Sequence, residues 1–211
     1  MSKQTNYAFV DQSNPDKKQL FIDAAICSLA KHGYKGTTVR KIAEYAGVAP
    51  GLLTHYFDGK EVLIAESYQY LAQSFLNDFR QNIDNSENNP LIVLRSFIEN
   101  IFRADGLGPE PLRVWLSFWT LTLTEPDLRS THQEIYKSYI KSIEELLKDA
   151  HDYSSTPPSM NINSMAIGIM SLLDGMWLEC CLNPDALSQN KNIEIVFDFV
   201  ESTTGLKLKT I

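Results

Sequence analysis

The chain has 211 residues, of which 44% are hydrophobic and 21% charged, which is enough apolar material for one ordinary domain or for a small domain joined to a larger one. The N-terminus is polar through Lys18, and Asp174 and Glu179 interrupt the longest apolar run, so neither a signal peptide nor a membrane span is expected. Three cysteines without metal-site spacing predict no metal site, no cofactor and a reduced, cytoplasmic setting.

The net charge of −7 is unevenly distributed along the chain. Residues 1–60 hold eight basic and five acidic side chains, a net charge of +3, whereas the rest of the chain holds 11 basic and 21 acidic side chains, a net charge of −10. This asymmetry favours a basic N-terminal module, suited to nucleic acid, on an acidic body.

Hydrophobic periodicity predicts an all-α chain of about nine helices. In the first part they are expected at about 16–32, 38–45, 49–56 and 60–83. Gly33 and Gly47 are expected to end the first two helices, and Thr38 is expected to cap the second.

Polar segments divide the second part of the chain. They separate helices expected at about 91–103, 112–124, 127–151, 162–182 and 189–201. Residues 119–124 (WTLTLT) also alternate with the period of a strand, but no neighbouring segment reads as a partner strand, so a helix is favoured.

Residues 46–57 (AGVAPGLLTHYF) combine a Pro-Gly pair with apolar and aromatic side chains. Three short helices, the last two joined by a tight turn containing Gly47, form a helix-turn-helix pattern. The major groove of DNA admits one helix, which has to present its first turns to the bases. Small residues at 49 and 51 permit close approach, and Pro50 suits a first helical turn. The pattern therefore predicts a DNA-reading element.

The run from residue 37 to 63 (TTVRKIAEYAGVAPGLLTHYFDGKEVL) resembles the TetR family of bacterial regulators. The matching positions are Thr38, Ile42-Ala43, Ala46-Gly47-Val48, Gly51, His55-Tyr56-Phe57, Lys60 and Leu63. Thr54 departs from the family pattern, because many members have Tyr there, and Thr54-His55 is instead similar to the BetI-type, choline-responsive repressors. Three later stretches, RVWLSFW (113–119), EPDLR (125–129) and SLLDGMWLECCL (171–182), resemble the same branch.

The resemblance implies a ligand-responsive repressor that binds a palindromic operator as a homodimer and is released by a small-molecule effector, with a choline-like quaternary ammonium as the candidate. We therefore expect a flexible arm over 1–15, a helix-turn-helix domain over 16–60, and a helical ligand-sensing and dimerisation domain over 61–211. Two alternatives stay open: a TetR-like activator, and a TetR-like protein that uses DNA as a platform for a protein partner.

Carried over position by position, the resemblance places six residues at or near DNA: Arg40, Pro50, Gly51, Thr54, His55 and Lys60. Thr38 and Tyr56 complete the eight predicted DNA-binding residues. We expect Arg40, Pro50 and Gly51 to read bases. The residues expected to contact the DNA backbone and so position the protein are Thr38, Thr54, His55 and Lys60. Each also has an ordinary structural interpretation: Thr38 as a helix cap, Arg40 as a solvated charge, His55 as a packing residue and Tyr56 as part of the core.

The later helices are expected to supply the dimer interface and the ligand pocket. Small residues Gly168, Ser171 and Gly175 share one face of a helix, and the helix over 189–201, with Phe197, is expected to complete a four-helix dimer bundle. The expected ligand-binding residues are Trp115, Phe118, Trp119, Tyr136, Asp174 and Trp177. Aromatic rings with a carboxylate suit a quaternary ammonium, although an aromatic stripe on packed helices is more often part of the core.

Catalysis is not expected from this sequence. The four histidines, His32, His55, His132 and His151, have neither metal-site nor triad spacing, and the ten glycines form no phosphate-binding loop.

Overall fold

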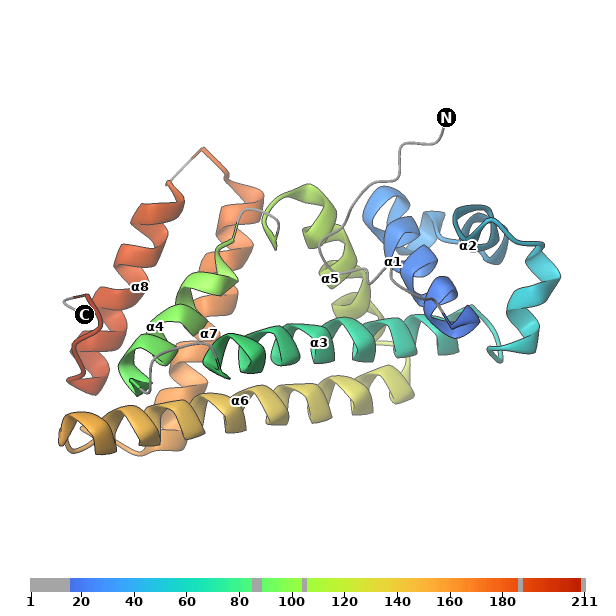
Figure 1. The fold of residues 1–211 in the computed structure, drawn as a ribbon. Helices are drawn as coiled ribbons and strands as arrows, with labels where there is room; N and C mark the ends of the chain where they lie inside the picture. The colour runs from blue at the N-terminus through green and yellow to red at the C-terminus, as the bar shows by residue number, and fades with distance from the viewer. Residues whose placement is uncertain (1–15, 85–88, 104–105, 186–187, 210–211) are drawn as a thin grey trace. The chain divides into compact units, whose positions relative to one another are not determined.

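The computed structural model describes residues 16–84, 89–103, 106–185 and 188–209. Across these residues the chain forms eight α-helices, one 3₁₀ helix and no strand, which confirms the all-α prediction. The α-helices are α1 (Lys17–Gly36), α2 (Val39–Ala46), α3 (Lys60–Asp84), α4 (Pro90–Ile101), α5 (Pro109–Leu121), α6 (Pro126–Ser154), α7 (Ile162–Leu182) and α8 (Gln189–Thr204). The 3₁₀ helix η1 (Pro50–His55) lies between α2 and α3 in the chain (Figure 1). The predicted arm over residues 1–15 lies outside the described residues.

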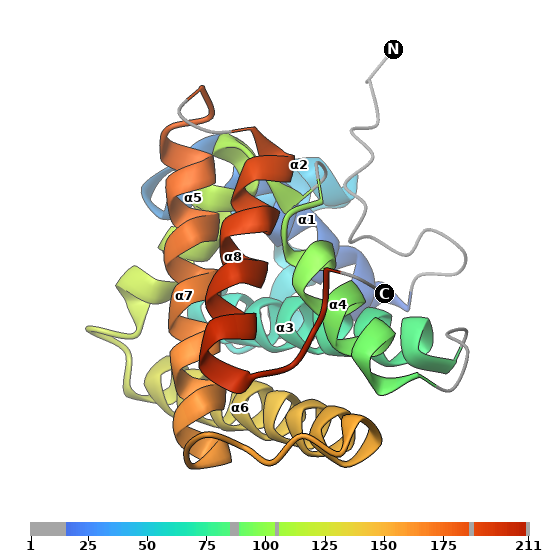
Figure 2. The same cartoon turned by 90° about the vertical axis from the view of Figure 1, so that its left-hand side faces the viewer.

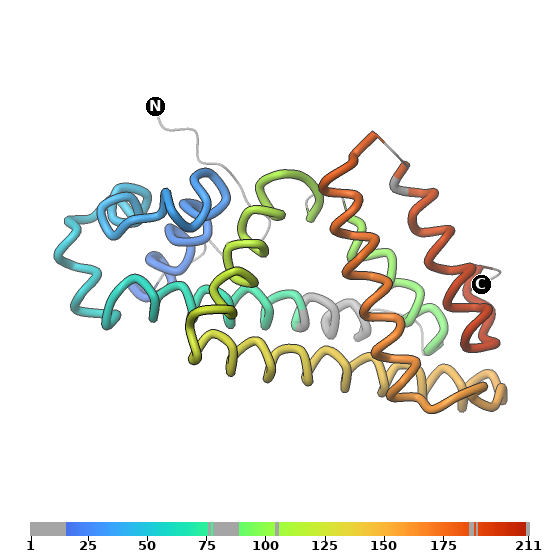
Figure 3. Tube along the Cα trace, turned by 180° about the vertical axis from the view of Figure 1, so that it is seen from behind, coloured from blue at the N-terminus to red at the C-terminus, as the bar shows by residue number. Residues whose placement is uncertain are grey.

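The chain folds into two compact units, and neither unit is one continuous stretch of sequence. The N-terminal unit comprises the described residues up to Ser74 together with Pro109–Gln133, and the C-terminal unit comprises the remaining described residues. Helices α3 and α6 each begin in the N-terminal unit and end in the C-terminal unit. Figure 3 traces α6 as one continuous helix. The predicted division of roles between 16–60 and 61–211 stays a prediction.

Glycine sets the two breaks that the sequence predicted in the N-terminal unit. Gly33 has φ +62° and kinks α1, and one further turn carries the helix to Gly36. Gly47 has φ +68° and ends α2 in the left-handed conformation that glycine adopts without strain. Thr38 caps α2, since its hydroxyl accepts the Lys41 N–H at 3.2 Å, so this predicted cap is confirmed.

Helix α5 packs along α1, although the two are far apart in the sequence. The Arg113 guanidinium of α5 donates to the Ala30 carbonyl of α1 at 3.0 Å, and Lys31 of α1 forms an ion pair with Glu110 of α5. Beside this pair, burial and the carboxylates of Asp23 and Glu110 raise the pKa of the Cys27 thiol to about 11. α1 is therefore held by residues that follow it by some eighty positions.

The segment 119–124 ends α5 and forms no strand. The helix stops at Leu121, three turn residues follow, and the Thr122 hydroxyl donates back to the Trp119 carbonyl at 2.7 Å. The Arg129 guanidinium binds the carbonyls of Thr122 and Leu123 at 2.9 and 3.0 Å. The alternating threonines thus serve a helix terminus, where side-chain hydroxyls satisfy carbonyls that lack a helical partner.

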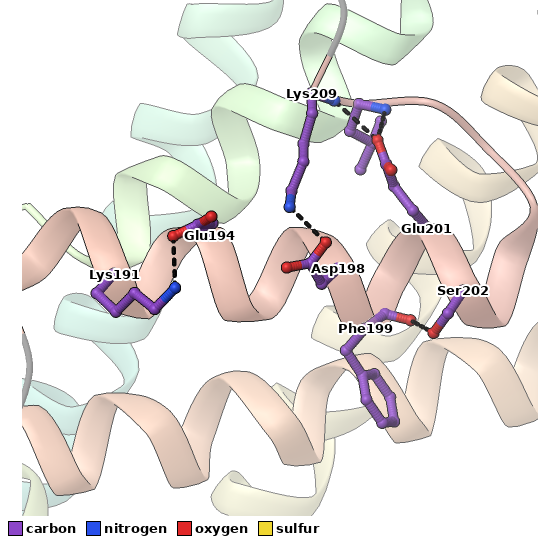
Figure 4. Close-up of polar contacts among 8 residues, drawn as sticks. Lys191, Glu194, Asp198, Phe199, Glu201, Ser202 and Lys209 are labelled. Carbon is purple, nitrogen blue, oxygen red and sulfur yellow. Dashed lines mark hydrogen bonds and ion pairs between the residues drawn. The ribbon is translucent and has the colours of Figure 1, made fainter.

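The core of the C-terminal unit joins α4, α6, α7 and α8 with the segment that follows α8. Its most buried members include Leu94, Phe97, Ile98, Ile143, Leu147, Ile169, Leu173, Val196, Val200, Leu206 and Leu208. Helices α7 and α8 lie side by side (Figure 2). The Glu201 carboxylate accepts the N–H groups of Leu208 and Lys209 at 2.5 and 2.8 Å, which fixes the final segment against α8 (Figure 4).

Helix α7 is long and apolar enough, by length and composition, to cross a membrane. It is the one such helix among the residues that the structure describes, and only 28% of its most apolar window is buried within the chain. A core or interface helix of a globular protein meets the same criterion. Helix α7 therefore has an apolar surface that this chain alone leaves uncovered.

Candidate functional site

The turn between α2 and η1 is closed by backbone hydrogen bonds. The Gly47 N–H donates to the Glu44 carbonyl at 3.3 Å, and the Val48 N–H donates to the Ala43 carbonyl at 3.1 Å. Pro50 occupies the start of η1, where its missing N–H costs no hydrogen bond. The turn therefore holds η1 at a fixed place against α2, with which it packs.

The element predicted as a short helix over 49–56 is a 3₁₀ helix over Pro50–His55. In a 3₁₀ helix, residues three apart align along one edge, so Gly51 and Thr54 share an edge, as do Pro50 and Leu53. The Thr54 hydroxyl donates to the Gly51 carbonyl at 2.8 Å, which ties that exposed edge together.

Apolar side chains anchor η1 from beneath. Leu53 is fully buried and Phe57 nearly so, and the ring of Phe57 meets Phe21 of α1 edge-on at 6.1 Å. Tyr56 is half-buried, with its ring 5.8 Å from Phe21. Burying a leucine side chain contributes about 1.5–3 kcal/mol, so Leu53 alone contributes substantially to seating a six-residue element.

The outer face of α2 and η1 is polar, small and exposed. Five of the eight residues predicted at DNA are exposed on these two elements: Arg40, Pro50, Gly51, Thr54 and His55. Thr38 is exposed at the start of α2, Lys60 is half-buried at the start of α3, and Tyr56 faces the core. No Cβ contact would hinder a side chain at Gly51, so glycine there leaves open space over the backbone.

The predicted ligand residues divide between the two units. In the N-terminal unit, Trp115 and Phe118 of α5 contact the ring of the buried Tyr68 of α3, and Trp119 lies beside Trp115. The Tyr68 ring stacks on Phe118 at 4.7 Å, and its hydroxyl lies 2.6 Å from Nδ1 of His132. Burial lowers the pKa of His132, which favours the neutral ring.

The other three predicted ligand residues belong to the C-terminal unit. Tyr136 is half-buried against the core, and the Trp177 indole N–H donates to the Gly106 carbonyl at 3.0 Å. Asp174 as a whole residue is exposed, yet the protein atoms around its carboxyl group raise the pKa to about 6 by desolvation. Asp174 is therefore a carboxylate at neutral pH with incomplete hydration.

The exposed face of α7 contains the small residues that the sequence predicted at a dimer interface. Gly168, Ser171 and Gly175 are exposed, with Ile167 and Leu182 on the same side of the helix. An added Cβ at Gly168 or Gly175 would meet nothing within this chain. The centre of this face is open and free of bulky side chains, and the exposed acidic residues Asp174 and Glu179 lie next to Gly175 and one turn after it.

Phe197, predicted at the same interface, lies in the core of its own chain. It is 5% exposed, with the Arg95 guanidinium 5.6 Å from the centre of its ring. Phe199 is the exposed phenylalanine of α8, and it points to the opposite side of that helix from Glu201 and Lys209 (Figure 4). The two rings differ by two positions, about 200° around a helix, so they face opposite ways.

Sequence reasoning missed one residue beside the predicted DNA contacts, Tyr34. The Lys60 ammonium lies 4.0 Å from the centre of the Tyr34 ring, and the Tyr34 hydroxyl donates to Glu61 at 3.4 Å. No periodicity predicts this contact, because Tyr34 follows the kink at Gly33 and meets the start of a helix 26 positions later.

Two family models match the chain, one toward each end. The model described as "Bacterial regulatory proteins, tetR family" matches residues 21–66, from within α1 to the start of α3. The model described as "BetI-type transcriptional repressor, C-terminal" matches residues 90–205, more than half of the chain. The chain belongs to the TetR family of bacterial transcriptional regulators, with a BetI-type C-terminal domain. This membership confirms the predicted regulator rather than an enzyme.

Curated relatives of this TetR family protein match along nearly its whole length. The HTH-type transcriptional regulator BetI of Pectobacterium carotovorum is 26% identical over 188 residues, covering 89% of this chain and 93% of the relative. The BetI protein of Serratia proteamaculans is 25% identical over 187 residues, covering 88% and 91%.

Solved structures share the fold. A putative transcriptional regulator from Pseudomonas aeruginosa is 29% identical with a TM-score of 0.79, covering 95% of each chain. A putative transcriptional regulator from Saccharomonospora viridis, solved in complex with choline, has a TM-score of 0.77 at 16% identity, covering 89% of this chain and 96% of that one. At that identity the second likeness concerns the fold.

Proposed function

We propose that this TetR family regulator acts in the cytoplasm as a repressor, binds a palindromic operator as a homodimer, and is released by a choline-like effector. The observation that carries the DNA-binding part is the outer face of α2 and η1. That face exposes small and polar side chains over the buried Leu53 and Phe57. An element seated by apolar contacts on one side, with an uncrowded backbone on the other, suits the major groove.

The proposed roles follow from chemistry and exposure. Arg40 offers two parallel donors to a guanine edge, and Pro50 with Gly51 lets the backbone approach the bases. Thr38, His55 and Lys60 carry donors for phosphate oxygens, and the Thr54 hydroxyl becomes a donor for phosphate when it leaves the Gly51 carbonyl. Tyr56 is half-buried against Phe21, so its part is to support η1 from behind.

The test is selection of binding duplexes from a random DNA pool with the purified protein. We expect an enriched site with two-fold symmetry, because each protomer of a homodimer reads one half. Failure to enrich any sequence would remove the DNA-reading role, and an enriched site without symmetry would remove the homodimer.

The dimer proposal rests on the uncovered face of α7. Gly168, Ser171 and Gly175 permit close approach of a second helix, while Ile167 and Leu182 supply apolar area at its margins. Phe199 of α8 replaces Phe197 in this proposal, because Phe197 is already buried within its own chain. Analytical ultracentrifugation at micromolar concentration should detect a dimer, and a monomer would contradict the proposal.

The effector proposal rests on the family and on the aromatic residues of α5 in the N-terminal unit; Asp174, in the C-terminal unit, is a separate candidate for contact with a cation. Aromatic rings attract a quaternary ammonium through cation–π contacts, and an incompletely hydrated carboxylate such as Asp174 favours a cation. Isothermal titration calorimetry with choline tests this, with the uncharged carbon isostere of choline as the matched control. We expect heat with choline alone; equal binding of both compounds would exclude charge recognition, and binding of neither would exclude a choline-like effector.

The proposed coupling passes through α5. This helix carries the aromatic cluster of the N-terminal unit and also contacts α1 through Arg113 and Glu110. A shift of α5 on effector binding would therefore move α1, on which η1 is seated through Phe21. Such a shift releases DNA when the two reading elements of a dimer no longer match the spacing of the half-sites.

A further inference from the structure

We propose that Tyr34 is a positioning residue for DNA binding: its ring holds the Lys60 ammonium at the start of α3 in place for a DNA phosphate. This inference rests on the proposed DNA-binding function and deepens it by assigning a role to a residue outside the predicted contacts. Tyr34, Lys60 and Glu61 all belong to the N-terminal unit.

The geometry restrains Lys60 from two sides. Its ammonium lies 4.0 Å from the centre of the Tyr34 ring, within the range of a cation–π contact. The nearest carboxylate oxygen, Oε1 of Glu61, is 3.9 Å away, beyond hydrogen-bond distance. The Lys60 side chain is only 20% exposed, so it does not extend freely into solvent.

The Tyr34 hydroxyl forms a hydrogen bond with Glu61, and this bond favours the contact between the Lys60 ammonium and the ring. It donates to Oε1 of Glu61 at 3.4 Å, so the carboxylate has a donor other than Lys60. The ammonium contacts a ring face and keeps its N–H donors for another acceptor. A phosphate oxygen is such an acceptor, and the N-terminus of a helix such as α3 also favours an anion.

Restraint before binding is what gives Tyr34 an effect on affinity. A free lysine side chain loses rotamer freedom when it binds a phosphate, and a side chain already held over a ring loses less. The ring face also leaves the positive charge intact, unlike a close ion pair. Tyr34 therefore strengthens the phosphate contact without touching DNA.

The experiment is a double-mutant cycle on DNA affinity, measured with the duplex selected for the wild-type protein. Tyr34→Leu removes the ring, Tyr34→Phe keeps the ring without the hydroxyl, and Lys60→Met removes the charge. We expect Tyr34→Leu to weaken binding about threefold per protomer, roughly tenfold for two protomers. Tyr34→Phe should weaken binding less than Tyr34→Leu, because it keeps the ring and loses only the hydrogen bond to Glu61. Tyr153→Leu, at an exposed tyrosine of α6, is the matched control.

The readout that separates positioning from structural damage is the cycle itself. In the Lys60→Met background, Tyr34→Leu should have no further effect, whereas damage to the helix-turn-helix would weaken both backgrounds equally and overturn the proposal. Lys60→Met should also lower the salt dependence of log affinity by about 0.9 per lysine. An equal loss with Tyr34→Phe and Tyr34→Leu would assign the effect to the hydroxyl and overturn the proposal as well.

Failure here is distinguishable from failure of the proposed function. If Lys60→Met binds DNA like the wild type, Lys60 makes no important phosphate contact and the proposed role of Tyr34 is wrong. The proposed DNA-binding function is unaffected by that result. If the wild-type protein selects no DNA, the proposed function fails first.

Discussion

The outer face of α2 and η1 and the outer face of α7 are both open to solvent in this chain, but they differ in chemistry. The first exposes Arg40, Thr54 and His55 and buries its apolar residues inward. The second exposes Ile167 and Leu182 beside glycines. A polar face is stable in water and can bind a polyanion such as DNA, whereas an exposed apolar helix face is typical of a surface that another protein surface buries. Exposure alone therefore does not identify a function, and the chemistry of the exposed atoms does.

The largest expected effect comes from placing a charge on the face of α7. Ile167→Glu should dissociate the proposed dimer, because a carboxylate buried between two helices has no partner. DNA affinity should then fall by at least about 100-fold through loss of two-site binding. Ultracentrifugation and DNA titration measure the two effects. Leu123→Glu, at a position 73% exposed in the N-terminal unit, is the control, and a dimeric Ile167→Glu protein would show that α7 needs no cover.

Next in size is the loss of Arg40 from the polar face. Arg40→Ala should weaken binding to the selected site by about 1–3 kcal/mol per half-site and relax the preference at one base position. Binding to a panel of single-base variants of the site measures this, with Arg103→Ala in the C-terminal unit as the control. Uniform weakening across all variants would assign Arg40 to the DNA backbone instead.

A smaller effect is expected where α5 holds α1. Arg113→Ala removes the hydrogen bond to the Ala30 carbonyl, at a cost of about 1–2 kcal/mol. The melting temperature should fall by about 2–8 °C for a chain of this size, as followed by circular dichroism. An unchanged melting temperature would show that the contact contributes nothing to seating α1, and the proposed coupling would lose its main support.

The smallest effect concerns Asp174 beside the face of α7. Its pKa of about 6 is higher than in the unfolded chain, so folding takes up a proton between about pH 4 and 6, and stability falls as pH rises through that range. Asp174→Asn should therefore stabilise the protein above pH 6, by about 1 kcal/mol or less because the residue is exposed, and should have no such effect near pH 4. Thermal melts across this range measure it, and a gain that is equal at both pH values would contradict the raised pKa.

Much of the fold could be predicted because local chemistry determines it. Gly33, Gly47 and Thr38 break or cap helices through their own backbone and side-chain properties, and periodicity located the helices to within a few residues. The 3₁₀ form of η1 could not be predicted from its six residues, since a segment of two turns or fewer fits either helix type.

The predicted sites depended more on which side of a helix faces inward. Helix α8 is apolar over more than one face, so the sequence could not separate the buried Phe197 from the exposed Phe199. The aromatic residues of α5 pack around Tyr68, a contact that depends on two helices meeting. Tyr34 was missed for the same reason, because its partner lies on another helix.

The central claim is that two copies of this TetR family protein read DNA together. The direct measurement is a titration of the protein into the selected duplex, intact and with one half-site replaced by random sequence. We expect two chains per intact duplex and a loss of at least about 100-fold in affinity when one half is replaced. One chain per duplex, with an affinity indifferent to the second half, would contradict it.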